Sequence, residues 1–149
     1  MAEHPLSAEL ARISVLGGGA WGTALALHCG RKGHEVLVWA REEEVVEGIN
    51  QSHENHHFFP GFQLPASVCA STDAQEVAKF GDLILVVIPT PFVERVMEPL
   101  KDVIRDDQIV CSCTKGILNN VSGSARERVP FAAQGAHARA ARPILRHRS

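Results

Sequence analysis

The feature that most constrains the fold is a run of three glycines between an apolar segment and a helix-forming segment. Residues 12–16, RISVL, are predicted to form a buried strand, and residues 20–32, AWGTALALHCGRK, a helix. The stretch GGGAWG at their junction contains the pattern G-x-G-x-x-G as Gly17, Gly19 and Gly22. Glycines in such a place let another group approach the backbone more closely than a side chain would permit. A strand, a glycine turn and a helix in this order are typical of the first unit of a parallel α/β sheet.

Short apolar runs alternate with amphipathic stretches over the following residues. The further apolar runs lie at 34–40, 67–71, 82–88 and 108–114, and the further helical stretches at 41–50, 72–80 and 92–104. Continuous Val, Ile and Leu runs are typical of strands that are buried on both faces. Strands that alternate with helices predict right-handed crossovers and a parallel sheet. We therefore predict an α/β fold, a Rossmann-type doubly wound parallel sheet of about five strands.

Charge divides the chain into two unequal parts. Residues 1–116 carry 9 Lys and Arg against 16 Asp and Glu, whereas residues 117–149 carry 6 Arg against one acid. We expect an N-terminal extension at 1–11, a Rossmann domain at 12–117 and a divergent, basic, disordered tail at 118–149. The overall net charge of −2 argues against nucleic acid as a partner of the whole chain. A basic arm for nucleic acid or an anionic membrane is the alternative interpretation of the tail.

The sequence predicts a cytoplasmic protein that does not bind a membrane. No segment reaches the ~18 apolar residues of a membrane helix, and the N-terminus lacks the apolar core of a secretory signal. The four cysteines, Cys29, Cys69, Cys111 and Cys113, form no CxxC pair. We interpret them as small buried apolar residues in a reducing compartment. The alternative is a redox or metal pair of Cys111 and Cys113, which would share one face of a strand.

Each glycine of the turn has a physical task if the turn binds a dinucleotide. Gly17 would make the tight turn, Gly19 would let the backbone approach a pyrophosphate, and Gly22 would let the helix pack closely against the strand. The N–H groups and the positive end of the helix would then face the anion. A tight turn without a ligand is the alternative.

The end of the second strand bears on which dinucleotide is bound. An acid in this place would bond the ribose 2′-OH and favour NAD, but the sequence has Arg41. A guanidinium suits a 2′-phosphate through bidentate hydrogen bonds, so we expect NAD or NADP, with Arg41 favouring NADP or dual use. Alternatively, Arg41 is a solvated residue at a helix start. The adjacent Glu42, Glu43 and Glu44 weaken the distinction between NAD and NADP that Arg41 suggests.

Five motifs in register resemble a known family. ISVLGGGAWGTALA, VWAR, INQSHENHHFFPGFQLP, VVIPTPF and CTKGI occur in this order. Together they resemble the N-terminal domain of soluble NAD(P)-dependent glycerol-3-phosphate dehydrogenase, over about residues 12–117. That family reduces dihydroxyacetone phosphate reversibly to sn-glycerol 3-phosphate with NADH or NADPH. The resemblance implies this small-molecule substrate, this activity and, for full-length members, a homodimer.

The resemblance also implies roles for individual residues. A catalytic role falls on Lys115, at the junction of cofactor and substrate. Cofactor-binding roles fall on Gly17, Gly19, Ala20, Trp21, Gly22, Arg41, Pro89, Phe92 and Lys115. Lys115 follows the fifth predicted strand, and ligands bind at the carboxyl ends of such strands. A solvated loop lysine is the alternative interpretation of Lys115.

The HENHH stretch is predicted to lie in a loop, which the resemblance places near the active-site cleft. His53, Glu54, His56 and His57 could suggest zinc, but they do not share a helix face and no fourth ligand is evident, so we predict no metal. Trp21 and Trp39 are expected to be packing residues, and the Trp21 N–H could also face the phosphate.

The resemblance ends near Ile117. In the family, a helical C-terminal domain supplies a second lysine and the Asn and Arg that bind the substrate phosphate, and the sequence shows none of it. We therefore expect a truncated cofactor-binding domain that is inactive by itself. A non-catalytic dinucleotide-binding fragment or isoform of the family is the alternative. A ketopantoate-type reductase would explain the glycine turn but not the HEN loop or TKGI.

Overall fold

The structure is a computed structural model that describes residues 10–113. The elements in chain order are β1 (Arg12–Leu16), α2 (Ala20–Arg31), β2 (Glu35–Trp39), α3 (Glu43–Glu47), the π-helical turn η1 (Gly48–Ser52), β3 (Val68–Ser71), α4 (Ala74–Phe80), β4 (Leu83–Val86), α5 (Thr90–Met97), the 3₁₀ turn η2 (Glu98–Leu100) and β5 (Ile109–Ser112). The predicted tail at 118–149, most of the extension at 1–11, and Lys115 lie outside the described residues.

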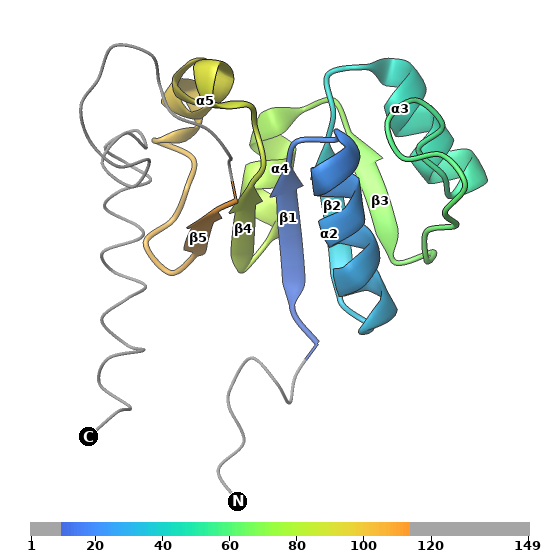
Figure 1. The fold of residues 1–149 in the computed structure, drawn as a ribbon. Helices are drawn as coiled ribbons and strands as arrows, with labels where there is room; N and C mark the ends of the chain where they lie inside the picture. The colour runs from blue at the N-terminus through green and yellow to red at the C-terminus, as the bar shows by residue number, and fades with distance from the viewer. Residues whose placement is uncertain (1–9, 114–149) are drawn as a thin grey trace, which may run out of the picture.

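The strands form a parallel sheet in the order β3-β2-β1-β4-β5 (Figure 1). On one side of β1, Ile13 lies opposite Val36 of β2, and on the other side it lies opposite Leu83 of β4. The chain therefore winds outward from β1 to β3, crosses back to β4 and continues to β5. This reversal confirms the predicted doubly wound sheet, and it opens a crevice at the carboxyl ends of β1 and β4.

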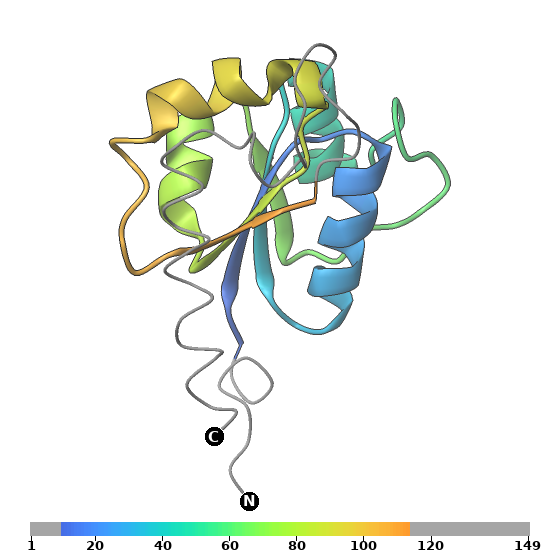
Figure 2. The same cartoon turned by 60° about the vertical axis from the view of Figure 1, so that its left-hand side comes forward.

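Helices cover both faces of the sheet (Figure 2). One buried cluster lies under α2 and α3, with Val15, Val38 and Ile49 fully buried. The other lies under α4 and α5 and includes Leu16 and Ile84. Neighbouring residues of a strand point to opposite faces, so β1, β2 and β4 contribute apolar side chains to both clusters.

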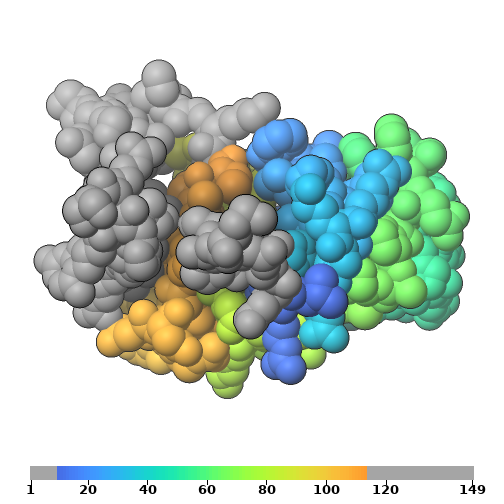
Figure 3. All heavy atoms as spheres, turned by 90° about the horizontal axis from the view of Figure 1, so that it is seen from below, coloured from blue at the N-terminus to red at the C-terminus, as the bar shows by residue number. Residues whose placement is uncertain are grey.

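The view from below shows the order of the elements along the sheet (Figure 3). Residues at and before β5, in orange, lie at one end, and the residues in green that precede and form β3 lie at the other. The blue residues of β1 and α2 lie between them. The glycine turn that follows β1 is therefore central to the sheet, because β1 is its middle strand.

Two helices differ from the prediction. The helix expected at 41–50 begins at Glu43 and changes to a π-helical turn that ends at Ser52. The Asn50 side chain in this turn bonds both backbone groups of Ala70 in β3, at 2.8 and 3.0 Å. A local pattern could not predict this turn, because it satisfies a contact with a strand 20 residues away.

The helix expected at 92–104 begins at Thr90 and ends at Met97. Pro91 lies in its first turn, where the missing proline N–H is not needed. The 3₁₀ turn that follows contains Pro99, which cannot donate the hydrogen bond that would continue an α-helix.

The expected burial of the cysteines and of Trp21 is wrong. Cys69 and Cys111 are exposed, and Cys29 and Cys113 are half-buried, although all four are free thiols as expected. The Trp21 side chain is 48% exposed. Trp21 lies in the first turn of α2, beyond the end of β1, so the sheet cannot cover its ring. Trp39 packs against the α4–α5 cluster and donates a hydrogen bond to the carbonyl of Thr72, at 3.0 Å.

None of the helices between residues 10 and 113 has the length and the apolar character needed to cross a membrane.

Candidate functional site

The turn between β1 and α2 is closed so tightly that two of its positions accept only glycine. Gly17 has a φ of +137°, and a Cβ there would lie 2.3 Å from the carbonyl oxygen of Val87. A Cβ on Gly22 would lie 1.9 Å from the carbonyl oxygen of Gly17. Both residues therefore act as the sequence predicts, Gly17 in the turn itself and Gly22 in the close approach of α2 to the end of β1.

Gly19 differs from these two glycines because its missing side chain leaves open space. A Cβ there would meet no atom within 4 Å. Gly19 is the N-cap of α2, which has no side-chain cap and no acid in its first turn. The positive end of the helix dipole is thus not compensated by a nearby carboxylate of that turn, which favours an anionic ligand in the open space.

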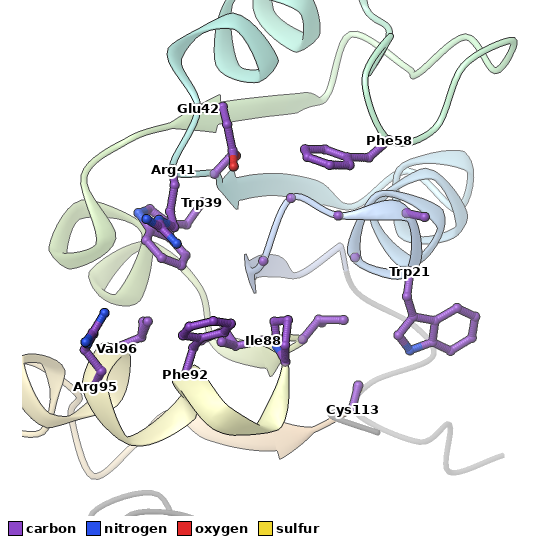
Figure 4. Close-up of a pocket in the computed structure, with 18 residues that line it drawn as sticks. Trp21, Trp39, Arg41, Glu42, Phe58, Ile88, Phe92, Arg95, Val96 and Cys113 are labelled. Carbon is purple, nitrogen blue, oxygen red and sulfur yellow. The ribbon is translucent and has the colours of Figure 1, made fainter. Parts of the chain in front are cut away.

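A cavity of about 650 Å³ lies in front of this turn (Figure 4). Its volume falls in the range of about 300–1,000 Å³ that is typical of ligand pockets. The wall comes from the glycine turn and α2, from the end of β2, and from the segment that joins β4 to α5. These are the elements that meet at the reversal of the sheet, so the pocket lies where open α/β sheets bind ligands.

The structure brings together nearly all of the predicted cofactor-binding residues. The residues of that set that line the cavity are Gly17, Gly19, Ala20, Trp21, Gly22, Arg41, Pro89 and Phe92. Pro89 is the N-cap of α5, and the Phe92 ring, one turn later, is 43% exposed. Lys115 lies outside the described residues, two positions beyond Cys113, which also lines the cavity.

The two ends of the cavity differ in chemistry. Trp21 and Cys113 lie at one end, and Trp39, Arg41 and Arg95 lie at the other (Figure 4). Arg41 follows β2, whereas Arg95 comes from α5, so the two guanidinium groups reach the cavity from different elements. Sequence reasoning did not identify Arg95, because nothing in the local pattern of α5 distinguishes it from a solvated helix residue.

Sequence reasoning also missed the role of Asn55 in the HENHH loop. Its side chain is fully buried and donates hydrogen bonds to the carbonyl oxygen of Gly18 and to the hydroxyl of Thr23, both at 2.9 Å. The side-chain oxygen Oδ1 of Asn55 accepts a hydrogen bond from the backbone N–H of Phe58, at 3.1 Å. Asn55 therefore joins the loop to the glycine turn, and Phe58 lines the cavity beside it. In the sequence, Asn55 is one polar residue among others in a polar loop, and this pattern does not distinguish it from its neighbours.

The polar side chains of the same loop contact each other and α3. His56 contacts Glu54 at 2.6 Å, and His57 contacts Glu44 at 2.8 Å. Within residues 10–113, no group of three or more His, Cys, Asp or Glu is arranged to hold a metal ion.

Cys111 and Cys113 lie on the same face of the end of β5, as their spacing predicts, and their thiols are hydrogen-bonded. The bond donated by Cys113 lowers the pKa of Cys111 to about 6 and raises the pKa of Cys113. The exposed Cys111 is therefore the more acidic thiol of the pair, and Cys113 is the one that lines the cavity.

A family model described as "NAD-dependent glycerol-3-phosphate dehydrogenase N-terminus" matches residues 12–132. The chain belongs to this glycerol-3-phosphate dehydrogenase family. The match begins at the first residue of β1 and includes every element of the described sheet.

Curated relatives in this family are the NAD(P)⁺ glycerol-3-phosphate dehydrogenases of Halothermothrix orenii, 37% identical, and of Parvibaculum lavamentivorans, 42% identical. Both alignments cover 71% of this chain, but 31% and 32% of the respective relatives. The chain thus spans about a third of the length of the curated relatives it matches.

Solved structures of the family have the same fold. The glycerol-3-phosphate dehydrogenase of Coxiella burnetii matches with a TM-score of 0.74 at 26% identity, over 88% of this chain and 44% of that one. The enzyme of Saccharomyces cerevisiae matches with a TM-score of 0.65 at 31% identity, over 72% and 34%. A ketopantoate reductase from Ralstonia solanacearum matches at 23% identity with a TM-score of 0.57, which shows only a shared fold.

Proposed function

We propose that the cavity binds a nicotinamide dinucleotide, with its pyrophosphate at the glycine turn. The observation that carries this proposal is the open space at Gly19, which lies between two tightly packed glycines and at the positive end of α2. Backbone N–H groups at a helix start stabilise a phosphate, and here no side chain blocks its approach. Curated members of the family are NAD(P)⁺ dehydrogenases, and the volume and position of this pocket suit such a ligand.

The lining suggests a role for each predicted residue. Gly17, Gly19 and Gly22 shape the backbone around the pyrophosphate, with Ala20 and Trp21 in the first turn of the helix. Arg41 lies at the end of β2, where the adenosine ribose binds in this fold. The remaining two residues, Pro89 and Phe92, form the opposite wall, and the exposed ring of Phe92 offers a face to a flat ring system.

We propose further that the dinucleotide serves the family reaction. In this reaction dihydroxyacetone phosphate, NAD(P)H and a proton give sn-glycerol 3-phosphate and NAD(P)⁺. Lys115, which follows β5 in the sequence, would bind the substrate as a point charge at its junction with the cofactor. Residues 12–117 would form the cofactor domain, and full-length relatives would work as homodimers in the cytoplasm. The free thiols of all four cysteines fit a reducing compartment.

Titration of the purified 149-residue chain tests the binding proposal. Trp21 and Trp39 both line the cavity, so their fluorescence reports its occupation. We expect saturable quenching by NADH or NADPH, and competition by ADP, which carries the pyrophosphate without the nicotinamide. A folded sample that binds neither dinucleotide would refute the proposal.

Turnover separates a dehydrogenase from a non-catalytic dinucleotide-binding protein of the same family. The assay follows the absorbance of NADH or NADPH after addition of dihydroxyacetone phosphate. We expect binding without turnover from these 149 residues, because the resemblance assigns the groups that hold the substrate phosphate to a second domain. Measurable turnover would show that this chain holds the substrate without that domain.

A further inference from the structure

Two arginines at one end of the cavity form no ion pair with any acidic side chain of the described residues. Within residues 10–113, neither the Arg41 nor the Arg95 guanidinium makes an ion pair or a side-chain hydrogen bond. Elsewhere in the same part of the chain, Arg12 contacts Glu35 at 3.5 Å and Arg105 contacts Asp107 at 3.1 Å. The two cavity arginines are thus available to a ligand.

The end of the cavity that carries the two guanidinium groups favours an anionic ligand. Arg41 and Arg95 lie at the same end as Trp39 (Figure 4), and the half-buried Val96 also lines the cavity. Two positive charges at one end of a partly apolar cavity attract an anion. Glu42 also lines the cavity but contacts neither arginine within ion-pair distance.

The chemistry of the proposed nicotinamide dinucleotide limits which anionic group can bind the two arginines. The glycine turn supplies one anion site, which the pyrophosphate would occupy, and the arginines form a second site at another end of the same cavity. NADH carries no phosphate outside its pyrophosphate, whereas NADPH carries one further phosphate, on the 2′ oxygen of the adenosine ribose. The ribose binds at the end of β2, next to Arg41.

We propose that Arg95 binds the 2′-phosphate together with Arg41, and that Arg95 is a specificity-determining residue for NADPH over NADH. This inference rests on the proposed dinucleotide site. Guanidinium groups bind phosphate oxygens through charge-assisted hydrogen bonds, and two groups from separate elements can hold the phosphate from two sides. Since α5 carries Arg95, the cofactor preference of this chain depends on a residue far from β2 in sequence.

Dissociation constants of NADPH and NADH for the full chain and its Arg95→Ala variant test the proposal. We expect the variant to bind NADPH roughly tenfold more weakly, the effect of losing one charge-assisted contact, while NADH affinity changes less than about twofold. Arg41→Ala should act in the same way. Arg31→Ala is the matched control, because Arg31 is an exposed arginine on α2 that does not line the cavity.

The outcomes separate this proposal from the one on which it depends. An equal loss of NADH and NADPH affinity in Arg95→Ala would mean that Arg95 stacks on the adenine, and would overturn the specificity role. An unchanged NADPH affinity would overturn it as well. If the parent chain binds NADH but not NADPH, the dinucleotide site stands and the 2′-phosphate site falls. Binding of neither refutes the dinucleotide site itself.

Discussion

Substitution of Asn55 by alanine should destabilise the protein and weaken dinucleotide binding together. The change removes three hydrogen bonds, to Gly18, Thr23 and Phe58, from a fully buried side chain. At a net ~0.5–1.5 kcal/mol for each bond, the free energy of unfolding should fall by about 1.5–4.5 kcal/mol. This is a large share of the ~5–15 kcal/mol that stabilises an ordinary domain.

The effect on binding follows from the position of Gly18. The Asn55 side chain in the HENHH loop donates a hydrogen bond to the Gly18 carbonyl. The adjacent Gly17 and Gly19 belong to the turn that faces the cavity. Without Asn55, the turn and Phe58 lose their common anchor. We therefore expect NADPH and NADH affinity to fall by about fivefold, which corresponds to roughly 1 kcal/mol.

Urea unfolding followed by circular dichroism measures the stability, and tryptophan fluorescence titration measures the affinity. Asn50→Ala is the matched control, because Asn50 also bonds the backbone, at Ala70 of β3, but does not line the cavity. Asn50→Ala should lower the free energy of unfolding by about 1–3 kcal/mol and leave the dinucleotide affinity unchanged. An Asn55→Ala variant that loses less than about 0.5 kcal/mol, the range of ordinary surface substitutions, would refute the reasoning.

Three further predictions concern the glycine turn and the thiols. Gly19→Val should abolish dinucleotide binding with little loss of thermal stability, because its side chain enters open space, and strong binding by this variant would contradict the assigned pyrophosphate site. Gly22→Ala should instead lower the free energy of unfolding by about 1–3 kcal/mol or prevent folding, because the added carbon meets the Gly17 carbonyl; an unchanged melting temperature would disprove this. The rate of Cys111 alkylation by iodoacetamide should rise with pH to half its maximum near the pKa of about 6, since the thiolate is the reactive form. Cys113→Ala should move that midpoint upward, and an identical pH profile in both proteins would rule out the thiol–thiol hydrogen bond.

Local patterns were sufficient to predict the five strands and four α-helices between residues 10 and 113 and their order along the chain, but not the π-helical and 3₁₀ turns. The spacing of apolar residues predicts whether a segment forms a strand or a helix, and this spacing can be recognised within the segment itself. The start of α4 depends on neighbouring residues alone, because the Asp73 side chain accepts bonds from the N–H groups of Gln75 and Glu76. Trp21 shows the limit of this reasoning: a large apolar ring suggests packing, yet its place in the first turn of α2 leaves it half exposed in the cavity.

The sequence by itself determined the glycine turn and hence the place of the candidate site, because strand, turn and helix are contiguous and their geometry depends on neighbouring residues. Only the tertiary structure decided which distant residues complete that site. Asn55 bonds Gly18 across 37 positions, and Arg95 lines the same cavity as Arg41 because the sheet reverses between β3 and β4. Such partners have no signal in the local sequence, since a hydrogen bond or a shared charge site depends on positions in space that only the packed chain fixes.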